Sequence, residues 1–294
     1  MTPGEFEFLK NFLKTRSGLV LSNDKQYLVE SRLLPIARSS KLETLSAVIQ
    51  TLQRSGNRAL ETDVIEAMTT NESFFFRDKT PFDNFRDTML PALLQSRSNF
   101  KQLKIWCAAA SSGQEPYSLA MCLKEEAAKM GGWRTRILGT DLSLEVLEKA
   151  KAGLYSQFEV QRGLPIQLLL KYFEQKGDMW QIGAPMRSMI EWKKLNLLEN
   201  FAHLGEFDIV FCRNVLIYFD QATKSEILAR LAKSLPEDGY LVLGAAETVV
   251  GLTDAFKPVP GKRGLFQKKP AVHAATGPGA STRFAAGGVA GLRR

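Results

Sequence analysis

The stretch IWCAAASSGQEPYSLAM, residues 105–121, joins two hydrophobic patterns across a run of small residues. Ile105, Trp106 and Cys107 are typical of the end of a buried strand, whereas the apolar residues within 117–123 recur at helical spacing. Residues 108–113 between them are only alanine, serine and glycine. A strand-to-helix turn with so few side chains would let a ligand approach the backbone closely. The alternative is that these small residues only allow the strand and the helix to pack.

The sequence on either side extends this unit into an alternating pattern. The apolar segments LKIWCA, RTRILGTD, FDIVFC and GYLVLGA are strand candidates, and amphipathic segments such as EPYSLAMCLKEEAAKM and SLEVLEKAKAG separate them. Such alternation is typical of a doubly wound, Rossmann-like α/β domain, to which we assign residues 76–269. Within it, short strand-like pieces around Gly177 and Gly183 predict a small antiparallel β insertion at about residues 164–195.

Different patterns occupy the two ends of the chain. Residues 1–75 repeat apolar residues at helical spacing, with interruptions at Gly18, Pro35 and Gly56, and so predict an all-α N-terminal domain. Residues 270–294 are rich in alanine and glycine and contain basic but no acidic residues. We expect this last segment to be a disordered basic tail.

Charge and cysteine usage disfavour several classes of function. The chain has 294 residues and a formal net charge of +8 at pH 7, but eight of its 39 basic residues and none of its 31 acidic residues follow Phe256. The body before Phe256 is therefore neutral and does not predict a nucleic-acid-binding surface. Three cysteines and two histidines lack metal-ligand spacing, so no metal site is predicted. No apolar run is long enough to span a membrane, and we expect a cytoplasmic protein without stable membrane insertion.

Polar residues at the ends of the predicted strands are candidates for ligand binding, because doubly wound sheets bind ligands at those ends. Asp141 ends the strand RILGTD, where a carboxylate could bind ribose hydroxyls or could instead cap the following helix. The turn at 108–113 lacks the three spaced glycines of a pyrophosphate site, which favours a nucleoside cofactor such as S-adenosylmethionine. Glu115 could receive an amino group, although a glutamate at a helix start is also a common surface residue.

Two more segments carry polar groups of the same kind. In FDIVFCRNVLIYFD, residues 207–220, Arg213 and Asn214 follow a buried strand and Tyr218 comes shortly after. NESFFFRD, residues 71–78, combines polar groups, three aromatics and Arg77 at the junction of the two predicted domains. A polar junction predicts a cleft, although the aromatics could instead belong to a core.

The motifs NESFFFRD, WCAAASSGQEPYSLAM, LGTDLS, NLL and FCRNVLIYFD, in this order over residues 5–268, resemble those of the CheR family, the chemotaxis-receptor glutamate methyltransferases of bacteria. The resemblance implies a helical domain followed by an S-adenosylmethionine-dependent methyltransferase domain with an inserted β-subdomain. It also implies methyl esterification of glutamates on the cytoplasmic helical bundle of methyl-accepting chemoreceptors, with S-adenosyl-L-homocysteine as the product of the cofactor.

The resemblance also implies roles for particular residues. Tyr218 would lie beside the transferred methyl group, and Arg97 would be a second catalytic residue. Ser73 stands where the family often has threonine, which keeps the hydroxyl. The residues implied to contact the cofactor are Asn71, Ser73 and Arg77 from the N-terminal side, Glu115 at its methionine end, Asp141 at its ribose, Asn196 and Leu197 near its adenine, and Arg213 and Asn214 completing the site.

The chemistry and the partner follow from these implications. A glutamate with a pKa of about 4.3 is already ionised at neutral pH, so transfer to it needs no strong base, and we expect Tyr218 and an arginine to orient it. The β insertion is too short for the loop with which some family members hold a receptor tether peptide. We therefore expect a monomer that binds receptors independently of such a tether.

Three other functions compete with this one. The missing glycine triplet disfavours a nicotinamide-dependent dehydrogenase, and the neutral body disfavours a nucleic-acid methyltransferase. A non-catalytic, S-adenosylmethionine-binding adaptor that binds receptors is harder to exclude. It predicts the loss of cofactor residues, whereas Glu115, Asp141, Arg213, Asn214 and Tyr218 are all present.

Overall fold

The computed structural model describes residues 1–54 and 56–270, so the tail expected to be disordered lies almost wholly outside the described residues. The N-terminal part of the chain is the predicted helical domain. It consists of α1 (Pro3–Ser17), η1 (Asn23–Lys25), α2 (Gln26–Ser39), α3 (Leu45–Gln53) and α4 (Arg58–Met68). Thr2 and Glu5 form a capping box at α1, while Thr44 and Asn57 cap α3 and α4. The apolar faces of these helices meet in a core of their own, which includes Leu9, Leu13, Val29, Leu33, Val48 and Val64.

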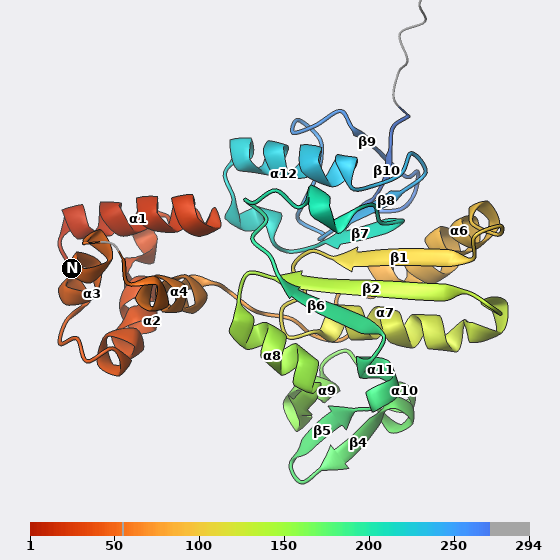
Figure 1. The fold of residues 1–294 in the computed structure, drawn as a ribbon, viewed down its shortest axis with the longest axis horizontal. Coiled ribbons are helices and arrows are strands. Elements are labelled where there is room, and N and C mark those ends of the chain that lie inside the picture. Colours follow the sequence, from red (N-terminus) through yellow and green to blue (C-terminus); the bar gives the residue numbers. More distant parts are fainter. Residues whose placement is uncertain (55, 271–294) are drawn as a thin grey trace, which may run out of the picture.

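The second part of the chain is built on a seven-stranded sheet of order β6-β2-β1-β7-β8-β10-β9 (Figure 1). The first five of these strands run parallel, whereas β10 pairs antiparallel with both of its neighbours, β8 and β9. Their bounds are β1 (Gln102–Cys107), β2 (Arg134–Asp141), β6 (Ile190–Lys194), β7 (Ile209–Cys212), β8 (Tyr240–Leu243), β9 (Phe256–Pro258) and β10 (Leu265–Lys268). This is the doubly wound arrangement that the alternating pattern predicts.

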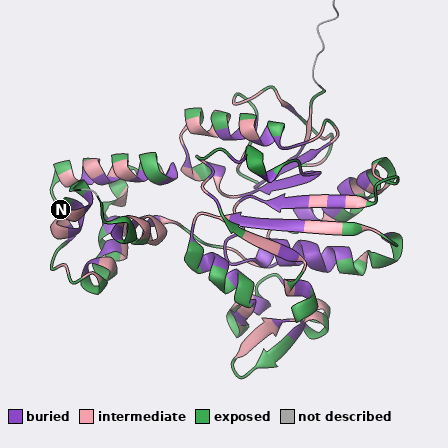
Figure 2. Cartoon of the chain, viewed as in Figure 1, coloured by how far each residue is buried: buried purple, intermediate pink, exposed green. Residues whose placement is uncertain are grey.

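Two apolar layers cover the sheet, and its central strands are buried (Figure 2). One layer contains α5 (Thr80–Asn84), the π-helical turn η2 (Phe85–Met89), α6 (Leu90–Ser96) and α7 (Gln114–Glu125), followed by η3 (Ala127–Lys129). The other contains α12 (Gln221–Lys233), η4 (Ala202–Leu204) and η5 (Leu216–Tyr218). The helix α8 (Leu144–Ala152) packs against β2 and β6. Within the described residues, no helix is both long and apolar enough to cross a membrane.

A small antiparallel sheet of order β3-β5-β4 projects from this domain (Figure 1). It consists of β3 (Leu154–Ser156), β4 (Phe173–Lys176) and β5 (Met179–Ile182), with α9 (Gln157–Gln161), α10 (Ile166–Tyr172) and α11 (Ala184–Arg187) around it.

The bounds of this insertion differ from the prediction of residues 164–195. The first strand, β3, precedes residue 164, and β6 belongs to the main sheet as the parallel neighbour of β2. The sequence of β6 alternates between apolar and polar residues because β6 is an edge strand. Ile190 is buried, and the Trp192 ring packs over Gly139.

Candidate active site

A cleft lies at the carboxyl ends of β1, β2, β6 and β7, where the strand order reverses between β1 and β7. The cleft encloses about 970 Å³ when the space is counted out to its open mouth. Ten of the eleven residues predicted for the site line this cleft: Asn71, Ser73, Arg77, Glu115, Asp141, Asn196, Leu197, Arg213, Asn214 and Tyr218.

The turn after β1 forms the floor of the cleft with its backbone. The N–H of Ala108 donates to Phe211 O (2.8 Å) and that of Ala110 to Thr140 O (2.9 Å), which fixes the turn against both neighbouring strands. Gly113 has a φ of 95°, and a Cβ there would lie 2.9 Å from Ala150 Cβ. Glycine is therefore required at this position by conformation and by space.

Asp141 ends β2 and turns its carboxylate toward this floor. Its Oδ2 accepts from Ser111 N–H (2.8 Å) and its Oδ1 from Ser143 N–H (3.1 Å). Burial raises the pKa of Asp141 above its ordinary value, although backbone donors oppose that shift. The cap of α8 is Ser143, which accepts from Val146 N–H, so Asp141 is not the N-cap residue. Because each oxygen has two acceptor positions, the carboxylate keeps capacity for a bound hydroxyl.

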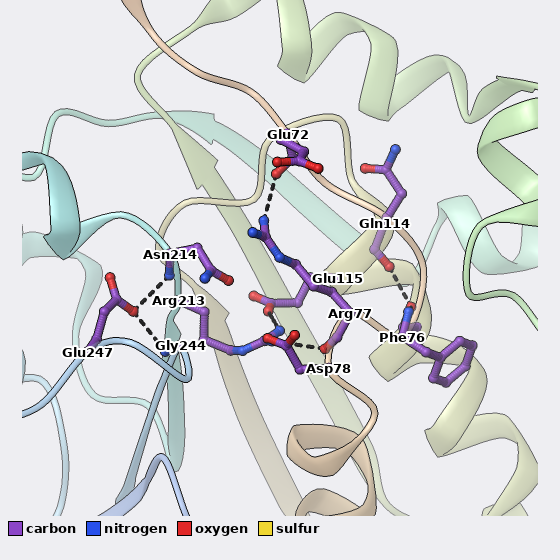
Figure 3. Close-up of polar contacts among 11 residues, drawn as sticks. Glu72, Phe76, Arg77, Asp78, Gln114, Glu115, Arg213, Asn214, Gly244 and Glu247 are labelled. Carbon is purple, nitrogen blue, oxygen red and sulfur yellow. Dashed lines mark hydrogen bonds and ion pairs between the residues drawn. The ribbon is translucent and has the colours of Figure 1, made fainter.

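A buried ionic network around Arg213 and Glu115 forms another part of the cleft lining (Figure 3). Arg213 donates to Glu115 Oε2 at 2.6 Å and to Asp78 Oδ2 at 2.8 Å, and it also donates to the backbone oxygen of Arg77 at 2.9 Å. The side chains of Arg213 and Glu115 are only 2% and 10% exposed. Burial raises the pKa of Glu115, and the positive charge of Arg213 opposes this rise. The Nε of Arg213 is buried without a hydrogen-bond partner among the described residues.

The segment NESFFFRD supplies both core and cleft residues. Phe75 is fully buried and packs edge-on against Tyr155, so it belongs to the core. Phe74 instead contacts two guanidinium groups, whose carbons lie 5.5 Å (Arg77) and 4.2 Å (Arg162) from the centre of its ring. Arg77 donates to the backbone oxygen of Glu72 at 2.8 Å. This places a guanidinium in the cleft wall beside the aromatic residues.

The helical domain closes one side of the cleft with Ser17, Leu19, Thr69 and Thr70. Several contacts with the α/β domain attach it there. Val20 N–H donates to Tyr218 O (2.9 Å), Asn196 Nδ2 donates to Arg16 O (2.7 Å), and Lys14 pairs with Asp220 at 2.8 Å. Both domains therefore build the site, as the polar junction predicts.

Arg97 is the predicted site residue that the structure does not bring to the cleft. It follows α6, close to the start of β1, whereas the cleft lies at the opposite ends of the strands. Its guanidinium pairs with Asp208 at 2.9 Å and with Asp238 at 2.5 Å, and these carboxylates raise its pKa. The assignment of a catalytic role to Arg97 is therefore corrected to a structural role at the amino-terminal edge of the sheet.

Three residues with evident roles at the site were missed by the sequence reasoning. Asp78 directly follows Arg77 and pairs with Arg213, and it lay inside the quoted segment NESFFFRD. Ser111 donates its hydroxyl to Asn71 O (2.9 Å), so it joins the turn after β1 to the N-terminal side of the cleft. Glu247 accepts a hydrogen bond from the backbone N–H of Asn214. It lies far from Asn214 in the sequence, and no local sequence pattern distinguishes it.

Comparison with known proteins agrees with this architecture. Residues 71–265 match the family described as "CheR methyltransferase, SAM binding domain", and residues 4–69 match "CheR methyltransferase, all-alpha domain". A chemotaxis protein methyltransferase 1 of Pseudomonas aeruginosa is 42% identical over 270 residues, covering 90% of this chain and 97% of the relative. A chemotaxis protein methyltransferase of Vibrio anguillarum is 41% identical over 267 residues, covering 90% and 96%. With both of its folded parts matched, this chain belongs to the CheR family of S-adenosylmethionine-dependent methyltransferases of chemotaxis.

Proposed function

We propose that this enzyme methylates glutamate side chains on the cytoplasmic helical bundle of methyl-accepting chemoreceptors, in the cytoplasm, to form glutamyl methyl esters. The observation that carries the proposal is the composition of the cleft: buried carboxylates on its floor and wall, Arg77 and the half-buried Tyr218 lining it as well, and no histidine among the residues that line it. The names of the relatives and the resemblance of the motifs support chemoreceptors as the substrate.

The lining fits S-adenosylmethionine. In our assignment, Asp141 accepts from the ribose hydroxyls with the acceptor positions that Ser111 and Ser143 leave free. Glu115 uses one oxygen for Arg213, and its other oxygen is available for the ammonium group of the methionine part. The small residues after β1 allow close approach to the backbone, and no phosphate-binding glycine triplet is present. Asn196 and Leu197 would contact the adenine.

The cofactor supplies an electrophilic methyl group on a sulfonium ion when it is bound. The acceptor glutamate is ionised at neutral pH without help from the protein. The residues of this chain therefore have to align the acceptor oxygen and keep water from it, and such positioning supplies roughly 7–11 kcal/mol in favourable cases. A cleft without a catalytic base is sufficient for this reaction.

Charge balance identifies the arginine that would orient the acceptor. Arg213 already faces the carboxylates of Glu115 and Asp78. Arg77 lines the same cleft, and the hydrogen bond that the structure gives its guanidinium goes to a backbone oxygen rather than to a carboxylate. The resemblance implies that Arg77 contacts the cofactor; on this charge balance we instead propose that Arg77, together with the Tyr218 hydroxyl, orients the acceptor carboxylate. Arg77 must bind it loosely, because a tightly paired carboxylate is a poorer nucleophile.

The small β sheet supports binding that does not depend on a receptor tether peptide. Its hairpin joins β4 to β5 through Gly177 and Asp178 alone, which leaves no long loop at this tip. We propose that a monomer reaches the receptor bundle through the cleft mouth and the adjoining helical domain. Calorimetry with a receptor C-terminal pentapeptide should then show no specific binding.

The test is transfer of labelled methyl from S-adenosylmethionine to a chemoreceptor cytoplasmic fragment, followed by mild alkali. Base-labile label on glutamate is expected, and label that resists alkali would contradict an ester. Tyr218→Phe should lower turnover while leaving binding of S-adenosyl-L-homocysteine unchanged, because only the hydroxyl beside the acceptor is removed. Unchanged turnover would contradict the role of Tyr218. Tight cofactor binding without any transfer would favour the adaptor function.

A further inference from the structure

The carboxylate of Glu247 accepts hydrogen bonds from five backbone N–H groups, of which those of Asn214 and Gly244 are drawn in Figure 3. Its Oε2 accepts from Asn214 at 2.8 Å and from Gly244 at 2.7 Å. Its Oε1 accepts from Val215 at 2.9 Å, from Leu216 at 2.8 Å and from Ile217 at 3.3 Å. Consecutive N–H groups that converge in this way form an anion-binding concavity, and here the anion is a side chain of the same protein.

The segment that Glu247 holds is the one that lines the cleft after β7. Asn214 has a φ of 58°, in the left-handed region that residues other than glycine rarely adopt. Asparagine adopts this region more readily than other non-glycine residues do, and the hydrogen bond from its backbone N–H to Glu247 helps to hold it there. Asn214, Val215 and Tyr218 all line the cleft, whereas Glu247 lies behind them and outside its lining. The carboxylate therefore acts on the cleft only through this backbone.

Gly244 completes the support from the other side. A Cβ at Gly244 would lie 2.8 Å from both Asn214 Nδ2 and Glu247 Oε2. The backbone of Gly244 is not in the left-handed region, so alanine is acceptable there by conformation. The added methyl group would instead displace the side chains of Asn214 and Glu247.

We propose that Glu247 is a positioning residue, whose ionised carboxylate sets the backbone of residues 214–217 and thereby places Asn214 against the cofactor and Tyr218 near the acceptor. The charge is needed as well as the shape. A glutamine has one acceptor oxygen, so its amide NH₂ would face either the two donors now bound to Oε2 or the three bound to Oε1. At least two backbone N–H groups would then face the NH₂ group of the glutamine, which is also a donor, and would lose their hydrogen bonds.

The test compares Glu247→Gln with Glu237→Gln, a matched substitution at an exposed glutamate between α12 and β8. Binding of S-adenosyl-L-homocysteine is measured by calorimetry well below the melting temperature of each variant. Glu247→Gln should weaken binding roughly 10- to 100-fold, the scale of losses caused by a small displacement of binding groups, and Glu237→Gln should not change it. Gly244→Ala should weaken binding in the same way, which provides a second variant if Glu247→Gln folds poorly.

A double-mutant cycle separates positioning from simple stabilisation. If Glu247 acts by placing Asn214, then Asn214→Ala should weaken binding in the wild-type background and have little further effect in Glu247→Gln. Wild-type affinity in Glu247→Gln, with only a lower melting temperature, would overturn the proposal, and so would fully additive effects. The part that concerns Tyr218 rests on the proposed function. Because the binding readout needs no acceptor, failure of receptor methylation would leave the result for Asn214 standing.

Discussion

Replacing Arg213 by methionine should strongly destabilise the protein, because it leaves the Glu115 carboxylate buried without its main partner. The two side chains are 2% and 10% exposed and are joined at 2.6 Å. Removing one member of such a buried pair costs about 3–5 kcal/mol of unfolding free energy. Asp78 adds little to this figure, because its side chain is 40% exposed and water can replace its contact.

The pH dependence of this deficit identifies its cause. Burial already raises the pKa of Glu115, and Arg213 opposes that rise, so the pKa of Glu115 should rise further in Arg213→Met. A carboxyl whose folded-state pKa lies above its unfolded value costs stability as pH increases through that interval. The deficit should therefore be full above the pKa that Glu115 has in the variant, and should shrink as the pH falls through it.

The assay is urea unfolding of wild type and Arg213→Met at several pH values from about 9 down to about 5, because a buried glutamate without a partner can reach a pKa of about 8–9. Arg136→Met is the matched control, since Arg136 and its partner Glu191 are 37% and 41% exposed and such pairs contribute about 0–1 kcal/mol. A deficit for Arg213→Met below about 1 kcal/mol at neutral pH would refute the reasoning. A large deficit that does not change with pH would refute the part assigned to Glu115.

Three other substitutions test separate parts of the structure. Asp141→Asn should weaken binding of S-adenosyl-L-homocysteine about 10- to 100-fold in calorimetry, because losing a hydrogen bond to a charged group costs about 1.5–3 kcal/mol; unchanged affinity would remove Asp141 from the site. Arg97→Met should lower the unfolding free energy by about 1–3 kcal/mol through loss of its bonds to Asp208 and Asp238, while the affinity and turnover of the folded enzyme stay at wild-type values. Gly163→Ala should destabilise by about 1–3 kcal/mol in thermal or urea unfolding, because Gly163 has a φ of 84° and a Cβ there would lie 2.1 Å from Phe75 O; wild-type stability would contradict this.

The sequence predicted a residue's position in the fold well where the end of a strand determined that position. Asp141 and Arg213 follow strands whose hydrophobic patterns are clear, and parallel strands end at one edge of a sheet. Any polar residue directly after such strands therefore reaches the same cleft. Arg97 was implied by the resemblance alone. It precedes a strand, so the same logic places it at the opposite edge of the sheet, where the structure has it.

Residues whose roles depend on distant partners could not be found in this way. Glu247 lies 33 residues from Asn214, and a glutamate in a loop has no pattern that distinguishes it from a solvated one. Likewise, Arg32 had no distinguishing mark as one of several basic residues of the helical domain, yet it donates to the backbone oxygens of Met68 and Thr69 at the end of α4. The edge strand β6 was misassigned because its partner β2 lies some 50 residues earlier in the chain.

The Arg32 contacts explain why the helical domain belongs to the site rather than being an appendage to it. The chain leaves α4 at residues 69–70, which line the cleft, and continues directly into Asn71 and Arg77. Arg32 fixes the start of this connection and Arg213 fixes its end, by donating to Arg77 O. The same domain also binds the Tyr218 backbone through Val20. A displacement of the helical domain would therefore move the backbone that carries both the proposed cofactor contacts and the proposed acceptor contacts.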